Sequence, residues 1–564
     1  MPNERATGTV EEIGQLDHSI TSEYRIFGPP GTGKTTHIGR QIRHAVDRYG
    51  PASVLVTSFS RTAAAELAGR DLPISRNRIG TLHSFCYRAL GAPVVAESCV
   101  EEWNRGNPRL AITPVRKQGK LDGEDVASEE ATTLAKDGDE ILQQLSRYRG
   151  LMVPQKSWPL VLCQFAEKWT RYKRAHSLLD FTDLIEQCLR DVATAPNDPK
   201  VIFADEAQDL NRMQLALIRK WGERASYFVV AGDDDQCVFG FAGASPDAIL
   251  DPDIPADHKI ILKQSFRVPG AVHQVADKLI HQVTRRQEKI YLARPEAGAV
   301  HRLSTGTYKA PEYFILKSAE EHLKQGKTVM FLAACSYMLQ PVVAILRKRG
   351  IPFHNPYRKS NGFWNPLRMG KKGSIVNRVL ALLVGHPGFG QGHHPWTFGD
   401  LAQWADCIAA HGILKHGTKE NFQHYDRVQS ATVGRLDEVF ETGALALLMD
   451  AFEGDQRALL NWWRRLMTAD VRSRFQFPLD VATAHGSRAL MDPPQVVVGT
   501  IHSVKGGQAD VVYLFPDLSQ AGDAQYQRNG EPRDSVIRVF YVGATRARET
   551  LYICQRESLM AFSI

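Results

Sequence analysis

The feature that most constrains this chain is a glycine-rich loop between a predicted strand and a predicted helix. The loop comprises Gly28, Pro29, Pro30, Gly31, Thr32, Gly33, Lys34 and Thr35. A short apolar run, 24–27, precedes it, and a helix-like segment, 36–49, follows it. Glycines let the backbone wind tightly, so that N–H groups at the helix N-terminus converge on a phosphate. This order of elements matches the GxxxxGK[ST] pattern of a P-loop.

A second segment supplies the carboxylates that a P-loop enzyme needs. An apolar, strand-like run ends in the sequence DEAQD at 205–209. In such an enzyme Lys34 reaches the phosphate oxygens, and Thr35 and Asp205 hold Mg²⁺. Glu206 would then orient and deprotonate the attacking water. An acid-rich helix N-terminus would explain one carboxylate but not the whole string. We therefore predict an NTP hydrolase that uses ATP and Mg²⁺.

A third strand-like run, 227–231, ends in the sequence GDDDQ at 232–236. Three neighbouring acids beside a phosphate site are unfavourable unless a metal, arginine or backbone donors offset them. We therefore consider this turn a candidate switch. The amide of Gln236 can both donate and accept hydrogen bonds, which suits it to sense a γ-phosphate.

Composition sets the broad class of the protein. A length of 564 residues predicts roughly three or four compact units. The net charge of +7 mildly favours a polyanionic partner. The eight cysteines are scattered without a C-x-x-C pair, which argues against a zinc ribbon and fits a reducing cytosol. The polar N-terminus is no signal peptide, and no apolar run approaches the roughly 18 residues of a membrane span. These features predict a cytoplasmic protein.

Nine segments then occur in an order typical of one family. They are GPPGTGKT, TSFSRTAAAEL, TLHSF, LDFTDL, DEAQD, GDDDQCVFGFAGA, LKQSFR, TIHSVKG and RVFYVGATRAR. This set, running from Gly28 to Arg548, resembles the superfamily 1 DNA helicases of the UvrD/Rep/PcrA type, as a compact member. The resemblance implies an α/β fold with two RecA-like parallel-sheet motor lobes, each with a mainly helical insertion.

The resemblance also implies domain boundaries. The first lobe would comprise 1–90 and 179–260, with 91–178 as its helical insertion. The second lobe would comprise 261–350 and 491–564, with 351–490 as its insertion. Within the first insertion, 122–140 carries eight acids against one lysine, which predicts a solvated surface rather than a site.

Further nucleotide-site residues follow from the same resemblance. Arg267 would bind the γ-phosphate, and Phe266 would stack near the adenine where relatives usually carry Tyr. Arg546 resembles an arginine finger, and its always-charged, forked guanidinium suits the charge that spreads over the transferring phosphoryl group. An arginine considered in isolation would more often form a surface ion pair.

Four positions depart from the family pattern. Gln15 is the nearest candidate for the adenine-reading glutamine, and Thr36 stands where relatives often place an arginine near the base. These two departures predict loose selectivity among NTPs. Ala242 replaces a common arginine, and Gln508 stands where relatives carry glutamate. These two affect coupling and ribose contacts.

The resemblance assigns a second set of residues to DNA: Phe59, His83, Ser84, Phe239, Phe241, Thr500 and His502. The phenylalanines would face bases, since stacking on aromatic rings contributes about 1–3 kcal/mol per base and tolerates any sequence. His502 would contact the DNA backbone. For Phe239 a core position is the alternative.

A basic and aromatic stretch lies between Glu321 and Asp400, where no acid intervenes. Its basic residues are Lys324, Lys327, Arg347, Lys348, Arg349, Arg358, Lys359, Arg368, Lys371, Lys372 and Arg378, interleaved with Phe353, Tyr357, Phe363 and Trp364. The mixture suits a nucleic-acid track, and a solvated basic face explains it equally well.

The sequence thus predicts an ATP-dependent DNA helicase and translocase that moves 3′→5′ on single-stranded DNA and binds single-strand/duplex junctions. It would act in DNA repair, replication or recombination. One alternative is a translocase, or an ATP-switched subunit of a repair or defence complex, without productive unwinding. The chain ends 16 residues after Arg548, so we expect any nuclease partner to be a separate polypeptide. RNA is a less favoured substrate.

Overall fold

The computed structural model describes residues 23–59, 64, 67, 69, 71–115, 137–311, 314–358, 362–369, 374–425 and 432–564. Several residues singled out in the sequence fall outside this part of the chain: Gln15, much of the segment TSFSRTAAAEL, most of the acidic stretch, Lys359, Lys371 and Lys372.

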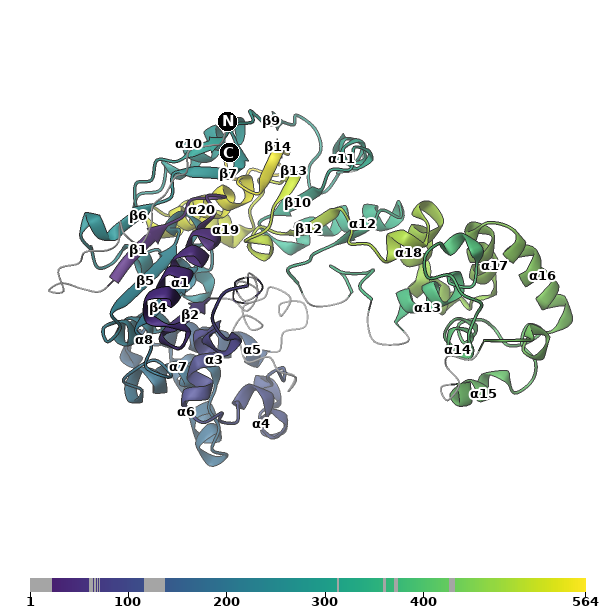
Figure 1. The fold of residues 1–564 in the computed structure, drawn as a ribbon, viewed down its shortest axis with the longest axis horizontal. Coiled ribbons are helices and arrows are strands. Elements are labelled where there is room, and N and C mark those ends of the chain that lie inside the picture. The colour runs from purple at the N-terminus through teal and green to yellow at the C-terminus, as the bar shows by residue number, and fades with distance from the viewer. Residues whose placement is uncertain are drawn as a thin grey trace. The chain divides into compact units, whose positions relative to one another are not determined.

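The chain packs into two compact units, each built around its own sheet (Figure 1). The first unit comprises Met1–Ala299 and Gln520–Glu549 together with Ile564, and the second comprises Val300–Ser519 and Thr550–Ser563. The sequence predicts a finer division, into two lobes that each carry an insertion, and this four-part division stays a prediction.

The first unit contains a six-stranded sheet with the strand order β3-β2-β4-β5-β1-β6. Its strands are β1 (Glu23–Phe27), β2 (Val54–Ser58), β3 (Ile79–Thr81), β4 (Val201–Asp205), β5 (Tyr227–Gly232) and β6 (Lys259–Ile261). All five pairings are parallel. The carboxyl ends of the strands therefore share one edge, where α/β sheets bind ligands.

Helices cover this sheet, and others pack in a separate cluster beside it (Figure 1). The helices of the first unit are α1 (Lys34–Tyr49), α3 (Leu82–Ala89), α4 (Glu101–Gly106), α5 (Asp137–Gly150), α6 (Leu160–Ala175), α7 (Phe181–Asp191), α8 (Arg212–Gly222), α9 (Asp247–Leu250), α10 (Gly270–Ile280), α19 (Gln520–Tyr526) and α20 (Glu531–Ala544). Helices α4 and α6 are among those in the separate cluster. Helix α1 buries Ile38, Ile42, Ala45 and Val46, which recur at helical spacing, and it packs against β2, β4 and β5.

The second unit contains another six-stranded sheet, ordered β11-β12-β10-β13-β14-β9. Its strands are β9 (Ala299–Arg302), β10 (Val329–Ala333), β11 (Phe353–His354), β12 (Val496–Thr500), β13 (Ala509–Leu514) and β14 (Ala547–Ile553). The pairings of β11 with β12, β12 with β10, and β10 with β13 are parallel. The predicted fold class, α/β with two parallel-sheet lobes, is therefore confirmed.

Two helices flank the second sheet, and six more gather in one bundle between β11 and β12 of the chain (Figure 1). The flanking helices are α11 (Phe314–Lys324) and α12 (Gln340–Lys348). The bundle comprises α13 (Ile375–Leu383), α14 (Phe398–Ala405), α15 (Thr418–Tyr425), α16 (Thr442–Glu453), α17 (Gln456–Leu466) and α18 (Ala469–His485). Trp404 and Trp463 are fully buried there, and the indole N–H of Trp463 donates to the Trp404 carbonyl oxygen at 3.0 Å.

Among the helices that the structure describes, none combines the length and the apolar character needed to cross a bilayer.

A buried ionic network fixes α6, α5 and α7 of the first unit to one another. Asp180 caps α7 and accepts from the Trp169 indole at 3.0 Å and from Lys173 at 2.5 Å. Arg149 donates to Asp180 at 3.2 Å and to Asp183 at 2.6 Å. Burial alone would raise the pKa of Asp180, but Arg149 and Lys173 outweigh it and hold that pKa below its usual range.

This network predicts an asymmetry between two basic residues of α6. Lys173→Met removes one partner of a buried pair and should destabilise the first unit by about 3–5 kcal/mol. Arg171→Met is the control, because its ion pair with Glu167 is exposed, at 76% and 72% of the two side chains. That change should alter stability by only about 0–1 kcal/mol. Hydrogen exchange of the α6 and α7 amides measures both effects. Equal losses of protection would contradict the role of the network.

Candidate functional site

The P-loop connects β1 to α1 with the geometry of an anion site. The backbones of Gly31 and Gly33 are left-handed, with φ of 74° and 75°. Thr32 closes the turn, since its N–H and its hydroxyl both donate to the Pro29 carbonyl oxygen, at 3.2 and 2.8 Å. Gly33 is the N-cap of α1 and provides no side-chain cap. No N-cap side chain covers the first turn of the helix, whose N–H groups are the kind that bind phosphate.

Strand β7 (Gln264–Pro269) lies directly against this loop within the first unit. The Phe266 N–H donates to the Gly31 carbonyl oxygen at 2.8 Å, and the Ser265 hydroxyl donates to the Pro30 carbonyl oxygen at 2.8 Å. The Phe266 side chain is 72% exposed, which leaves its ring free to stack on a base. The structure therefore brings Phe266 and its neighbour Arg267 to the P-loop. Their contacts with nucleotide stay a prediction.

Lys34 and the two carboxylates after β4 form the centre of the site. The Lys34 ammonium lies 2.7 Å from a Glu206 carboxylate oxygen and 3.7 Å from an Asp205 carboxylate oxygen. Glu206 has a left-handed backbone, with φ of 53°, and its N–H donates to Asp205 at 2.9 Å. Burial lowers the pKa of Lys34, but Glu206 and Asp205 outweigh it and raise that pKa above its usual value.

These residues fit a nucleoside triphosphate with its metal. Asp205 and the Thr35 hydroxyl offer the oxygen ligands that Mg²⁺ prefers. The Lys34 ammonium pairs with both carboxylates. It can exchange them for phosphate oxygens, because these are anionic partners of the same kind. The loop leaves no space to spare, because a Cβ on Gly28 would lie 2.7 Å from the Lys34 Cβ.

A chain of hydrogen bonds links Glu206 to Arg546, and we call it the amide relay. Gln208 donates from its side-chain nitrogen to Glu206 at 2.5 Å, and its oxygen accepts from the Asp233 N–H at 3.0 Å. Gln236 donates to the Asp233 carboxylate at 2.8 Å, and its oxygen accepts from Arg546 at 3.1 Å. The two predicted catalytic residues Gln236 and Arg546 therefore lie in contact, within the first unit.

Sequence reasoning missed three members of this region. Gln208 was visible in DEAQD but had no assigned role. Lys289 and Arg286 bind the three acids of the GDDDQ turn, which are completely buried. The charge of the segment TRRQEK, 284–289, is a signal in the sequence, but the 51 residues between Arg286 and Asp235 hid the pairing.

The three phenylalanines predicted to face DNA bases form one aromatic row. Phe59 and Phe239 are stacked, with ring centroids 5.6 Å apart, and Phe241 meets Phe239 edge-on at 5.9 Å. Phe239 is half-buried, whereas Phe241 is 38% exposed. The row suits stacking with bases. Because Phe239 is half-buried, it can both pack on the core and present part of its ring to a base.

The other two predicted DNA residues of the first unit begin α3. The Ser84 hydroxyl donates to the Thr81 carbonyl oxygen at 2.7 Å, so it already has a local partner. His83 lies edge-on to Phe181 at 6.2 Å. Burial lowers the pKa of His83 to about 4, so its imidazole is neutral at pH 7. A neutral ring can bind DNA through hydrogen bonds or stacking but not as a cation.

Thr500, His502 and Gln508 belong to the second unit. Thr500 is buried at the end of β12, and its hydroxyl oxygen accepts from the Ser503 N–H at 3.3 Å. His502 is half-buried, and Gln508 is exposed. The buried Asn355 supports this loop from behind, because its amide donates to the Ser503 hydroxyl and to the Val498 carbonyl oxygen, each at 3.1 Å.

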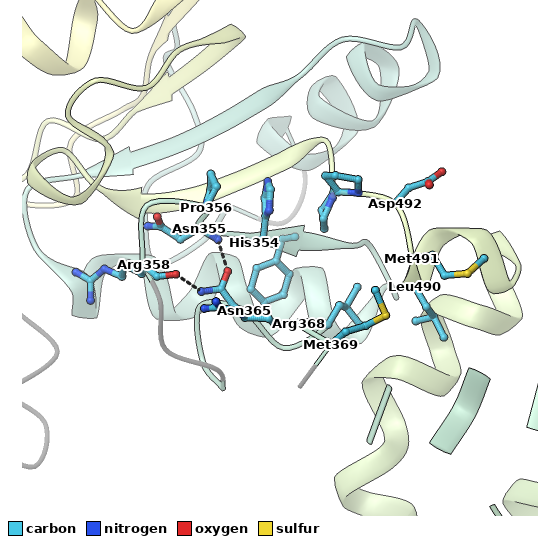
Figure 2. A pocket seen from close by; sticks show the side chains of 14 residues that line it. His354, Asn355, Pro356, Arg358, Asn365, Arg368, Met369, Leu490, Met491 and Asp492 are labelled. Carbon is cyan, nitrogen blue, oxygen red and sulfur yellow. Dashed lines mark hydrogen bonds between the residues drawn. The ribbon is translucent and has the colours of Figure 1, made fainter. Parts of the chain in front are cut away.

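The basic and aromatic stretch has a mixed environment. Phe353 and Trp364 are buried, and the Arg358 guanidinium lies over the Trp364 ring, 4.9 Å from its centroid. Figure 2 shows a pocket beside them of about 340 Å³, with Arg368 on its wall and Asn365 joined to Asn355. Some of the stretch is therefore core, and both interpretations stay open for its exposed residues.

The P-loop geometry yields a prediction about two glycines that both have a positive φ. A Cβ on Gly31 would lie 2.4 Å from the Arg267 Cβ and 2.8 Å from the Ser265 hydroxyl oxygen. Gly31→Ala should therefore displace β7 and abolish ATP hydrolysis. Gly50 is the control: its φ is 81°, but a Cβ there meets nothing within 4 Å.

Gly50→Ala should cost about 1–3 kcal/mol of backbone strain and keep its ATPase rate. Steady-state hydrolysis, measured beside thermal unfolding, checks the pair. A Gly31→Ala protein with normal hydrolysis would contradict the docking of β7.

Comparisons with known proteins agree with this geometry. Residues 11–254 match the UvrD/REP helicase N-terminal domain, and residues 495–554 match the UvrD-like helicase C-terminal domain. The ATP-dependent DNA helicase PcrA of Staphylococcus aureus is 22% identical over 95% of this chain and 82% of its own length. The putative ATP-dependent DNA helicase YjcD of Bacillus subtilis is 26% identical over 47% of this chain and 37% of its own length.

The first match contains the P-loop and both acidic turns, and the second contains the Thr500 loop and Arg546. The order of the motifs, the two parallel sheets and the matched domains agree with one another. The chain therefore belongs to the superfamily 1 DNA helicases of the UvrD/Rep/PcrA type and is an ATP-hydrolysing DNA helicase of that family.

Proposed function

We propose that this helicase moves 3′→5′ along single-stranded DNA and couples each ATP hydrolysed to a change in its grip on the bases. The amide relay is the observation that carries the proposed coupling, whereas the polarity is proposed from the family resemblance alone. The relay runs from Glu206 to Gln236, and Phe239 follows Gln236 by three residues and stacks on Phe59. A change at the nucleotide thus reaches the aromatic row through a short, packed segment.

ATP would bind with its phosphates on the P-loop N–H groups and its base against Phe266. Thr35 and Asp205 would hold Mg²⁺, which supplies charge neutralisation for the phosphate oxygens. Lys34 would leave Glu206 and pair with the phosphates. Thr36 is exposed at the start of α1, and it cannot replace the charge of an arginine beside the base. This supports loose selectivity among NTPs.

Hydrolysis would then use the carboxylate that Lys34 releases. Glu206 would orient the attacking water and accept its proton, while Gln208 keeps the carboxylate in position. Arg267, beside Gly31, and Arg546, at the far end of the relay, would stabilise the charge on the transferring phosphoryl group. Gln236 accepts a hydrogen bond from Arg546 and would keep that guanidinium in position.

In the first unit, the DNA strand would lie along the aromatic row. In the second unit, we propose His502 and Thr500 as DNA-binding residues, on the basis of the family. We propose single-strand/duplex junctions as the substrate and repair, replication or recombination as the setting, on the basis of the family. The four-part organisation of the chain, with an insertion in each lobe, is part of this proposal. A separate nuclease or repair partner is compatible with it.

The experiment that tests the function is the steady-state ATPase rate, at low salt, with no polymer, single-stranded DNA, duplex DNA and single-stranded RNA. Stimulation by single-stranded DNA is expected. A rate that no polymer changes would contradict the proposal. A strand-displacement assay with 3′ and 5′ tails then tests polarity, and hydrolysis without strand separation would favour a translocase that does not unwind.

Glu206→Gln should abolish hydrolysis in every arm of this assay, because an amide cannot accept the proton of the attacking water. The fold should survive, since glutamine still accepts from Gln208. Retention of more than a few per cent of the activity would exclude Glu206 as the base. Lys34→Ala should also abolish hydrolysis, but through lost nucleotide affinity, which equilibrium binding of a fluorescent ATP analogue distinguishes.

Arg546→Ala should leave nucleotide binding nearly unchanged and lower turnover by about 10³-fold or more, because the guanidinium acts on charge that develops during the reaction. Arg548→Ala is the control, two residues away on β14. Parallel losses of binding and turnover in Arg546→Ala would contradict the finger role.

A further inference from the structure

A second buried lysine, Lys289, neutralises the three aspartates of the GDDDQ turn after β5. Asp233, Asp234 and Asp235 are completely buried, and so is the Lys289 side chain that faces them. The Lys289 ammonium contacts all three carboxylates, Asp233 at 3.1 Å and Asp235 at 2.9 Å, with Asp234 also in contact. It also lies over the ring of Phe27, 5.8 Å from the centroid, at the end of the P-loop strand.

Arg286 completes the neutralisation of this turn. Its guanidinium donates to both oxygens of Asp235, at 3.0 and 2.7 Å, in the forked geometry that arginine forms with a carboxylate. The Gln287 N–H donates to Asp234 at 2.9 Å. Every aspartate of the turn is thus bound by the segment 284–289, which we call the clasp.

The clasp is also fixed to the helix that precedes Arg546. Asp534 of α20 accepts from the Thr284 N–H at 3.0 Å and from its hydroxyl at 2.5 Å. Arg538 of α20 is completely buried and donates to the Arg285 carbonyl oxygen at 2.9 Å. The clasp therefore touches both elements that the amide relay joins, the turn that bears Gln236 and the helix that ends beside Arg546.

Stability alone does not account for this arrangement. Buried ion pairs are often no more stabilising than apolar residues of the same volume, because both charges lose their hydration. Charged pairs do fix orientation, because an ammonium and a forked guanidinium hold the carboxylates they bind in one position. Asp233 bonds to both Lys289 and Gln236, so the position of Lys289 determines where the Gln236 amide points.

We propose that Lys289 and Arg286 are positioning residues for hydrolysis, which hold Gln236 in contact with Arg546 by fixing the buried aspartates. The inference rests on the proposed roles of Gln236 and Arg546 in turnover. It assigns a task to a segment that touches neither nucleotide nor DNA in the proposed function. Loosening the clasp should therefore slow turnover while ATP still binds.

The test compares two neighbouring arginines of the clasp. Arg286→Gln removes the buried fork, whereas Arg285→Gln removes exposed ion pairs with Asp247 and Asp251 and is the matched control. In Arg286→Gln we expect the DNA-stimulated kcat to fall by about tenfold or more, with the KM for ATP within about threefold of normal. Arg285→Gln should keep both values. Arg286→Lys should recover part of the loss, because it restores the charge without the fork.

Two further measurements make the result decisive. Hydrogen exchange of 233–241 in the nucleotide-free protein should increase in Arg286→Gln and not in Arg285→Gln. If Arg286→Gln fails to fold, Lys289→Met combined with Asp234→Asn removes one charge of each sign, and the asparagine oxygen still accepts from Gln287. That variant should show the same loss of kcat and the same increase in exchange.

Three outcomes would overturn the inference. They are an unchanged kcat in Arg286→Gln or in the Lys289→Met/Asp234→Asn variant, unchanged exchange at 233–241 in the same variants, or equal losses in Arg285→Gln. Gln236→Ala separates this failure from failure of the proposed function. If Gln236→Ala slows turnover and the clasp variants do not, only the positioning role is wrong. If Gln236→Ala hydrolyses ATP at the normal rate, the role of Gln236 is wrong and the clasp has no turnover to support.

Discussion

The structure depends on how buried carboxylates are neutralised at one edge of the first sheet. Asp205 ends β4 and Glu206 follows it, three acids follow β5, and parallel pairing places these strand ends side by side. Like charges 4 Å apart interact by about 4 kcal/mol at the effective dielectric typical of proteins. The fold offsets this with Lys34 on one side and Lys289 with Arg286 on the other. ATP competes for only one of these cations.

Amides, rather than further charges, connect the two groups of acids. A glutamine donates and accepts at once, so Gln208 can join Glu206 to the Asp233 backbone, and Gln236 can join Asp233 to Arg546. A carboxylate at either position could only accept and would break the chain. In each amide the nitrogen donates on one side and the oxygen accepts on the other. Rotation of one amide by half a turn would therefore break the hydrogen bonds that connect Glu206 to Arg546. This is the kind of discrete change by which an ATP site can signal to a distant surface.

Much of the site could be predicted from sequence because its parts are local. A P-loop, a carboxylate pair at the end of a strand, and the strand expected at 24–27 and observed as β1, all follow from short-range pattern. The aromatic row was expected by resemblance, and its stacking of Phe59 on Phe239 is seen in the fold. The sequence could not show which residues of the basic stretch are buried, because Trp364 and Arg358 pack on each other while neighbours such as Phe363 are exposed.

By itself, the sequence determined the α/β class and the helicase family and predicted the residues that would meet nucleotide, because each of these depends on residue types at fixed spacing along the chain. The tertiary structure decided which charges pair. Lys289 lies 55 residues from Asp234, and Arg546 lies 310 residues from Gln236, so no spacing rule joins them. Their contacts follow from the packing of the 284–289 segment between the GDDDQ turn and α20. Burial makes those contacts necessary, since an aspartate removed from water must find a cation or a donor nearby.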